Sequence, residues 1–154
     1  MTLLLCIRVC PVRLFYGLGC VVVQVVTKRL PDGVHGYTDG VVIYVDDRLT
    51  AEQLLCTLVH ERIHIERGHT TRQLESEEMA VRYETARRLL PLDRIGACNK
   101  SGKLSDIARE LGVTKRVLMD RAATLTDSQA SEAGCWECQA CPVIRMRAER
   151  MVNA

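Results

Sequence analysis

The chain has 154 residues, of which 47% are hydrophobic and 26% charged, and its formal net charge is +2. This length suits one ordinary domain whose core needs no covalent staples. The composition excludes a disordered or collagen-like chain, and the net charge is too small for a general polyanion binder.

Two apolar, β-branched runs near the start predict strands at 21–26 and 41–45. Turn-forming residues lie between them at 31–33 and 39–40. We therefore expect these strands to form a small sheet edge or a hairpin, with the turn near 31–40.

Thr50, followed by Gln53, has the form of a capping box and predicts the start of a long helix. Good helix formers follow, and the helix is expected to run to Arg67, with Gly68 as its stop. A second long helix is predicted over about 73–90, before a proline.

A shorter helix pair is predicted at Leu104–Leu111 and Thr114–Leu125, with a break at Gly112. The segment beyond this pair lacks clear periodicity. The expected fold class is therefore α+β: a mostly helical domain with a small β-sheet near the N-terminus and a helix-turn-helix-like segment toward the C-terminus.

The first long helix carries the run His60-Glu61-Arg62-Ile63-His64. Two histidines at i and i+4 share one helix face, so both imidazoles can reach one Zn²⁺. Glu61 is placed to take a proton from a zinc-activated water. The alternative is a pair of helical histidines in ordinary hydrogen bonds.

A catalytic zinc needs a third protein ligand, and the second helix offers Glu78. At 100° per residue, Glu78 falls about 40° from Leu74, within the apolar stripe of that helix. A carboxylate in a core-facing row is costly unless something neutralises it, as a zinc would. An ion pair with Arg62, Arg82 or another arginine is the alternative, and Glu75 is the fallback ligand.

The runs at 56–69 and 78–91 resemble the zinc helix and the third-ligand helix of the ImmA/IrrE-type metallopeptidases of bacteria and phages. The resemblance covers about 21–127 and includes the turn residues before the second strand. It implies a zincin-like metallopeptidase fold with His60, His64 and Glu78 as zinc ligands and Glu61 as the catalytic residue. His69 and Tyr83, with Tyr37, are candidates for stabilising the oxyanion; the alternative for His69 is that it only closes the helix.

The resemblance also implies a function. The expected enzyme is a cytoplasmic, zinc-dependent endopeptidase of the gluzincin kind that cleaves a helix-turn-helix repressor and so relieves repression of phage, mobile-element or stress genes. The domain organisation that follows is an unassigned N-terminal extension at 1–20, a peptidase-like domain at 21–127 and a cysteine-containing tail at 128–154.

The segment 104–125 also has the form of a DNA-binding helix-turn-helix, with Lys115 and Arg116 at the start of its second helix. The same packing pattern serves helix pairs that touch no DNA, and basic residues are few, so DNA contact is not favoured. The alternative function is a DNA-binding regulator, or a repressor antagonist, with a structural or vestigial zinc site.

A second metal site is suggested by the overlapping C-x-x-C spacings of Cys135, Cys138 and Cys141. Three thiolates are one short of a closed structural site. A cysteine near the N-terminus completes the site only if the two ends of the chain meet.

The chain has eight cysteines in all. They would form a disulfide framework only in an exported protein. The longest uncharged run, residues 14–27, is shorter than the roughly 20 residues of a membrane-spanning helix. Arg8 and Arg13 interrupt the apolar stretch that a signal peptide would need. We therefore expect reduced thiols, a cytoplasmic location and no membrane partner.

Overall fold

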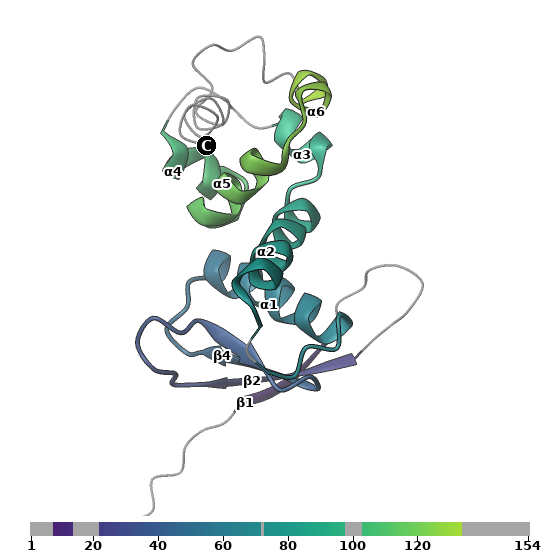
Figure 1. The fold of residues 1–154 in the computed structure, drawn as a ribbon. Helices are drawn as coiled ribbons and strands as arrows, with labels where there is room; N and C mark the ends of the chain where they lie inside the picture. The colour runs from purple at the N-terminus through teal and green to yellow at the C-terminus, as the bar shows by residue number, and fades with distance from the viewer. Residues whose placement is uncertain (1–7, 14–21, 72, 98–102, 134–154) are drawn as a thin grey trace, which may run out of the picture. The chain divides into compact units, whose positions relative to one another are not determined.

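The structure is a computed structural model, and it describes residues 8–13, 22–71, 73–97 and 103–133 (Figure 1). Within these residues the chain is α+β, with a small sheet followed by six helices, as the sequence predicts. The chain divides into two compact units, Met1–Glu77 and Glu78–Ala154.

The first unit contains a four-stranded sheet in the order β1-β2-β4-β3. Its β2 and β4 are parallel, with Val25 opposite Ile43, whereas β1 pairs antiparallel with β2 and β3 antiparallel with β4. The strands are β1 (Arg8–Arg13), β2 (Val22–Lys28), β3 (Gly36–Thr38) and β4 (Val42–Asp46).

The predicted strands are present, but a hairpin between them is wrong, because β2 and β4 run parallel. The connection contains β3, which is too short to stand out in the sequence and forms the hairpin with β4 instead. Asp39 closes that hairpin by accepting the backbone N–H groups of Val41 and Val42 at 2.9 and 2.8 Å. Gly40 supplies the required positive φ of 95°. Strand β1, in the segment left unassigned by sequence, was not predicted.

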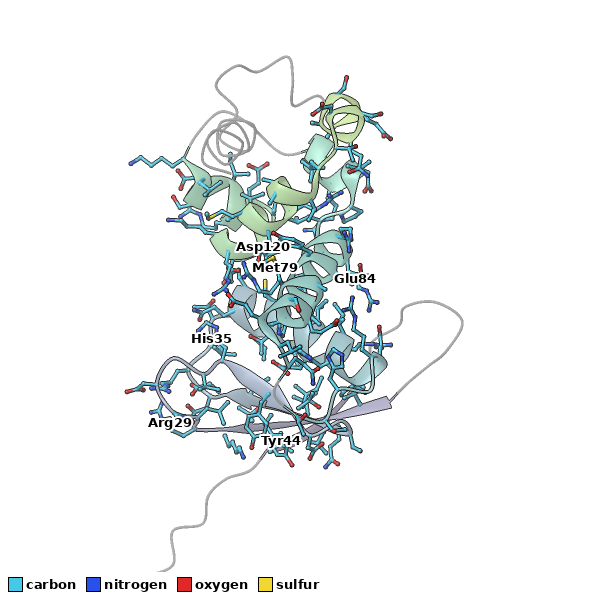
Figure 2. All side chains as sticks on the ribbon, in the orientation of Figure 1. Arg29, His35, Tyr44, Met79, Glu84 and Asp120 are labelled. Carbon is cyan, nitrogen blue, oxygen red and sulfur yellow. The ribbon has the colours of Figure 1, made fainter. Side chains whose placement is uncertain are left out.

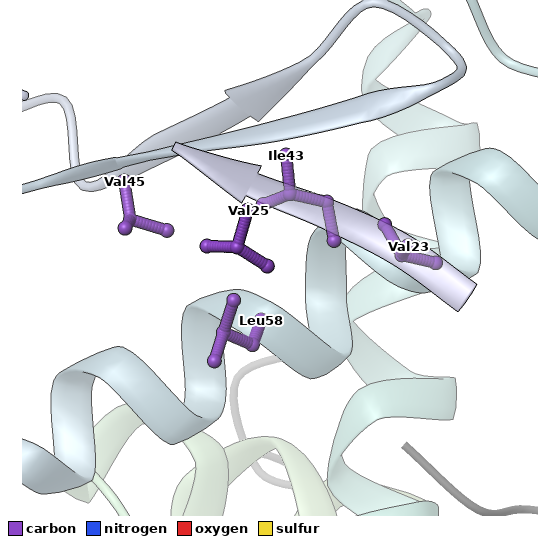
Figure 3. Close-up of a cluster of buried hydrophobic side chains, with 5 residues drawn as sticks. All are labelled: Val23, Val25, Ile43, Val45 and Leu58. Carbon is purple, nitrogen blue, oxygen red and sulfur yellow. The ribbon is translucent and has the colours of Figure 1, made fainter. Parts of the chain in front are cut away.

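Helix α1 (Ala51–Glu66) covers one face of this sheet (Figure 1). The core between them consists of β-branched strand residues packed on one leucine of the helix (Figure 3): Val23, Val25, Ile43, Val45 and Leu58. Because side chains alternate along β4, Tyr44 lies on the other face, as Figure 2 shows, where its ring stacks on Tyr37. The sheet therefore presents its apolar face to α1 and an aromatic pair on the face away from it.

A buried carboxylate fixes the end of β4. Asp46 accepts hydrogen bonds from the backbone N–H of Leu30 at 3.0 Å and from both the backbone and the guanidinium of Arg48 at 2.8 Å. The Arg48 guanidinium, helped by these backbone donors, holds the pKa of Asp46 far below its usual range. This clamp sets where the chain leaves the sheet to enter α1.

The second unit is helical, and its helices α2 (Glu75–Leu89) and α3 (Leu92–Ala97) are joined at a proline. Helices α4 (Leu104–Glu110) and α5 (Lys115–Thr124) flank Gly112, whose φ is 63°, as the sequence predicts. A short α6 (Asp127–Glu132) follows and was not predicted. Helix α2 starts three residues before the boundary between the units.

Two arginines, the exposed Arg94 and the buried Arg121, connect these helices through backbone carbonyl groups. Arg94 donates to the carbonyls of Leu89 and Leu111, at 2.7 and 2.8 Å, and Arg121 donates to that of Leu90 at 2.8 Å. Burial lowers the pKa of Arg121 from its usual value. The carbonyl groups at the C-terminal end of α2 are thereby satisfied from within the unit. Among the described helices, none combines the length and the apolar character that crossing a bilayer requires.

Candidate metal centre

The candidate centre is built on α1, whose start is fixed by the capping box that the sequence predicts. The Thr50 hydroxyl accepts the N–H of Gln53 at 3.3 Å, and the Gln53 side chain accepts the N–H of Thr50 at 3.0 Å. The predicted end is also confirmed: Arg67 is the C-cap and Gly68 follows with a φ of 69°. The histidines therefore lie in the last turns of a well-defined helix.

His60 and His64 bring one ring nitrogen each to the same point. Their Nε2 atoms are 3.1 Å apart, and the two rings meet edge to face with centroids 4.8 Å apart. His64 is buried, at 9% exposure, and His60 is half-buried. The i, i+4 spacing thus places both imidazoles on one face of the helix, as the sequence predicts.

Glu78 completes a group of three. One nitrogen of His60, one of His64 and one carboxylate oxygen of Glu78 all lie within 4.8 Å of one another. Glu78 is in the first turn of α2, directly after Glu77, which forms an ion pair with Arg67 at 3.6 Å. The fallback ligand, Glu75, is exposed and is not part of this group.

The donor set suits zinc. Two imidazole nitrogens and one carboxylate oxygen are the ligands of many catalytic zinc sites, with a fourth position left for water. A tetrahedral zinc bound at 2.0–2.1 Å would hold two nitrogens about 3.3 Å apart, close to the 3.1 Å between His60 and His64. Within the described residues, this is the group of side chains able to hold a metal ion.

Glu61, the candidate catalytic residue, is buried at 8% exposure on α1. Helix α1 approaches β3 closely here: a Cβ added to Gly36 would lie 2.5 Å from Thr57 Cγ2, 2.9 Å from the Tyr44 carbonyl oxygen and 3.6 Å from Glu61 Cγ. Only glycine leaves this space open. Gly36 therefore allows the helix turn that carries Glu61 to pack closely against β3.

Two arginines named as alternative partners of Glu78 have partners of their own. Arg62, which is buried, donates from Nε to Glu66 at 2.8 Å. Arg82 donates from Nε to Asp120 at 3.1 Å. Both pairs are internal, Arg62–Glu66 to α1 and Arg82–Asp120 to the second unit.

The three candidates for stabilising the oxyanion lie in different surroundings. His69 contacts His64, with the two Nδ1 atoms 2.9 Å apart. Tyr83 is half-buried on α2. Tyr37 stacks on Tyr44, on the sheet face away from α1, so its proposed role at the metal centre is wrong.

The remaining sequence-predicted sites are a surface and a cysteine cluster. Lys115 and Arg116 are exposed at the start of α5, behind the cap Thr114, as a recognition helix would require. Cys135, Cys138 and Cys141 lie outside the described residues. Cys56 is a buried thiol one helical turn before His60.

Sequence reasoning missed two contacts of this centre. The approach of Gly36 to α1 joins residues far apart in the chain and leaves no local pattern. The contact of His69 with His64 had a signal, because a glycine that ends a helix folds the next residue back onto the last turn. The comparisons add no relative: no protein-family model, curated protein or solved structure matches the chain significantly.

Proposed function

We propose that the chain is a zinc-dependent endopeptidase with a zincin-like site, in which His60, His64 and Glu78 hold the metal. The observation that carries the proposal is the convergence of these three side chains, with their ligand atoms within 4.8 Å of one another. The pattern His60-Glu61-Arg62-Ile63-His64 adds a carboxylate at the position where zinc peptidases carry their general base.

The chemistry divides between metal and protein. Zinc bound by these residues would act as a Lewis acid on the scissile carbonyl and would lower the pKa of a water at its open position. Glu61 takes the proton of the attacking water and passes it to the leaving amine. Glu61 is buried, at 8% exposure, on the helix that carries both histidines.

The substrate follows from the resemblance to ImmA/IrrE-type peptidases. We propose a helix-turn-helix repressor as the protein that is cleaved, in the cytoplasm, with release of repression as the result. This part depends on the runs at 56–69 and 78–91 rather than on any distance within the site.

The direct test compares wild type, Glu61→Gln and Glu52→Gln, all loaded with zinc, on purified helix-turn-helix repressors of the same genome. Glu52 lies in the first turn of α1 and serves as the matched control. Loss of the general base should slow cleavage by about 10²–10⁴-fold, with zinc content unchanged. Cleavage by Glu61→Gln at the wild-type rate would overturn the proposal, as would intact repressor in every reaction.

A repressor that is bound but stays intact by mass spectrometry would indicate the antagonist function instead. The other candidate, a DNA-binding regulator, rests on the exposed Lys115 and Arg116 at the start of α5. It predicts operator binding that is lost in the double variant K115A/R116A and that falls as salt rises. The same double variant should leave the peptidase activity unchanged.

A further inference from the structure

The C-terminal end of α1 places one more histidine against the centre. After the C-cap Arg67, the N–H of Gly68 donates to the carbonyl of Ile65 at 3.0 Å, and the N–H of His69 donates to that of His64 at 2.9 Å. These two bonds, with the positive φ of Gly68, form a Schellman motif. The motif folds the chain back so that His69 lies over the last turn, on His64.

An apolar contact often accompanies this motif, but here two imidazoles meet. The Nδ1 atoms of His64 and His69 are 2.9 Å apart, and the ring centroids are separated by 5.2 Å. The other ring nitrogen of His64, Nε2, faces His60 at 3.1 Å. The two nitrogens of His64 are therefore divided between a histidine partner on one side and the ligand group on the other.

This division constrains the proton of His64. A neutral imidazole carries one N–H, and a hydrogen bond between two Nδ1 atoms needs one donor and one acceptor. If His64 carries its proton on Nδ1, its Nε2 lone pair is available to a metal. The opposite tautomer would put the proton on Nε2 and remove that ligand.

We propose that His69 is a positioning residue of the metal centre: its Nδ1 accepts the Nδ1–H of His64 and so holds His64 in the tautomer whose Nε2 presents a lone pair to zinc. This inference rests on the proposed zinc site. A partner for the second nitrogen is what metal-binding histidines generally require, and its loss costs metal affinity. Here the partner is supplied by a helix cap.

The placement favours this role over stabilisation of an oxyanion. A group that stabilises the oxyanion must face the open position of the metal, on the Nε2 side of His64. The Nδ1 of His69 instead contacts the Nδ1 side of that ring.

The first experiment reads the tautomer in the metal-free protein. Long-range ¹H–¹⁵N correlation spectra distinguish Nδ1–H from Nε2–H imidazoles, and the chain has only four histidines to assign. We expect Nδ1–H at His64 in wild type and in His69→Asn, whose amide oxygen stands near the place of Nδ1. In His69→Leu, the preference should be lost. An Nε2–H tautomer at His64 of wild type would overturn the proposal without any variant.

The second experiment measures zinc affinity by competition with a chelator. We expect His69→Leu to bind zinc about 10–100-fold more weakly than wild type, and His69→Asn to recover most of the loss. His35→Leu, at an exposed histidine in the first unit, is the matched control and should bind as wild type. Circular dichroism spectra confirm that each variant is folded.

The outcomes separate this inference from the function that it extends. Wild type that binds zinc, with His69→Leu equally tight, overturns the positioning role alone. A His69→Asn variant as weak as His69→Leu also overturns it, because the loss would then reflect packing. Wild type without zinc affinity overturns both the proposed function and this inference.

Discussion

The Nε2 atoms of His60 and His64 lie 3.1 Å apart, although a full helical turn separates the two residues along α1. Removing either imidazole leaves a metal with too few protein ligands for a catalytic zinc site. We expect wild type to hold about one zinc per chain and His64→Ala to hold almost none. Elemental analysis after dialysis measures the zinc content. His35→Ala should keep the wild-type content, and a His64→Ala protein that still held one zinc would place the metal elsewhere.

Glu78 and its neighbour Glu77 provide a matched pair. Glu78 belongs to the ligand group, whereas the Glu77 side chain is 51% exposed and pairs with Arg67. We expect Glu78→Gln to weaken zinc binding strongly and Glu77→Gln to leave it within about twofold, because an exposed ion pair contributes little. Chelator competition gives both values, and equal affinities in the two variants would remove Glu78 from the ligand set.

Gly36 should not tolerate a side chain. A Cβ there would meet Thr57 Cγ2 at 2.5 Å and the Tyr44 carbonyl oxygen at 2.9 Å, and the backbone neighbour cannot yield easily. We expect Gly36→Ala to lower the free energy of unfolding by about 1–3 kcal/mol, as overpacking does. Urea denaturation measures the change.

The control for that change is Gly96→Ala, whose new Cβ would find its nearest atoms at 3.9 Å or beyond. Because Gly96 lies inside α3, alanine should there be neutral or stabilising. If Gly36→Ala proved as stable as wild type, the close approach of α1 to β3 would be incorrect.

The low pKa of Asp46 leads us to expect that the first unit loses stability in acid. Hydrogen bonds from Arg48 hold the pKa of Asp46 well below its ordinary value of 3.8. A carboxyl whose pKa is depressed on folding stabilises the protein above its ordinary value, and this contribution is lost as pH falls toward the folded-state pKa. The denaturant midpoint of wild type should therefore fall below about pH 4.

Asp46→Asn should lower that midpoint at pH 7 and show a shallower fall in acid. Asp47→Asn is the control, because Asp47 is an exposed residue that forms a surface ion pair with Arg29. Parallel acid profiles for wild type and Asp46→Asn would contradict the clamp.

Local signals account for what the sequence predicted. The capping box at Thr50, the stop at Gly68 and the break at Gly112 each depend on a few neighbouring residues, and all three helix boundaries lie where they were expected. Within the metal centre, the convergence of His60 and His64 follows from helix periodicity alone. Glu78 was selected because a carboxylate in an apolar stripe requires compensation.

Non-local signals account for what was missed. The direction of β2 relative to β4 depends on β3, whose three residues carry no strand pattern. Strand β1 is recognisable only through its pairing with β2, since its sequence includes Pro11 and two arginines. Helix α6 begins with a capping box but has only 6 residues, which is too short for a helical periodicity to appear in the sequence.

The cap at the end of α1 also provides a reporter. Because the amide N–H of His69 donates to the carbonyl of His64 while the two rings meet, the exchange of that one proton with deuterated water measures how often the cap opens. An opening too local to unfold the sheet would still separate the two imidazoles. The lifetime of the histidine pair can thus be read from a single amide.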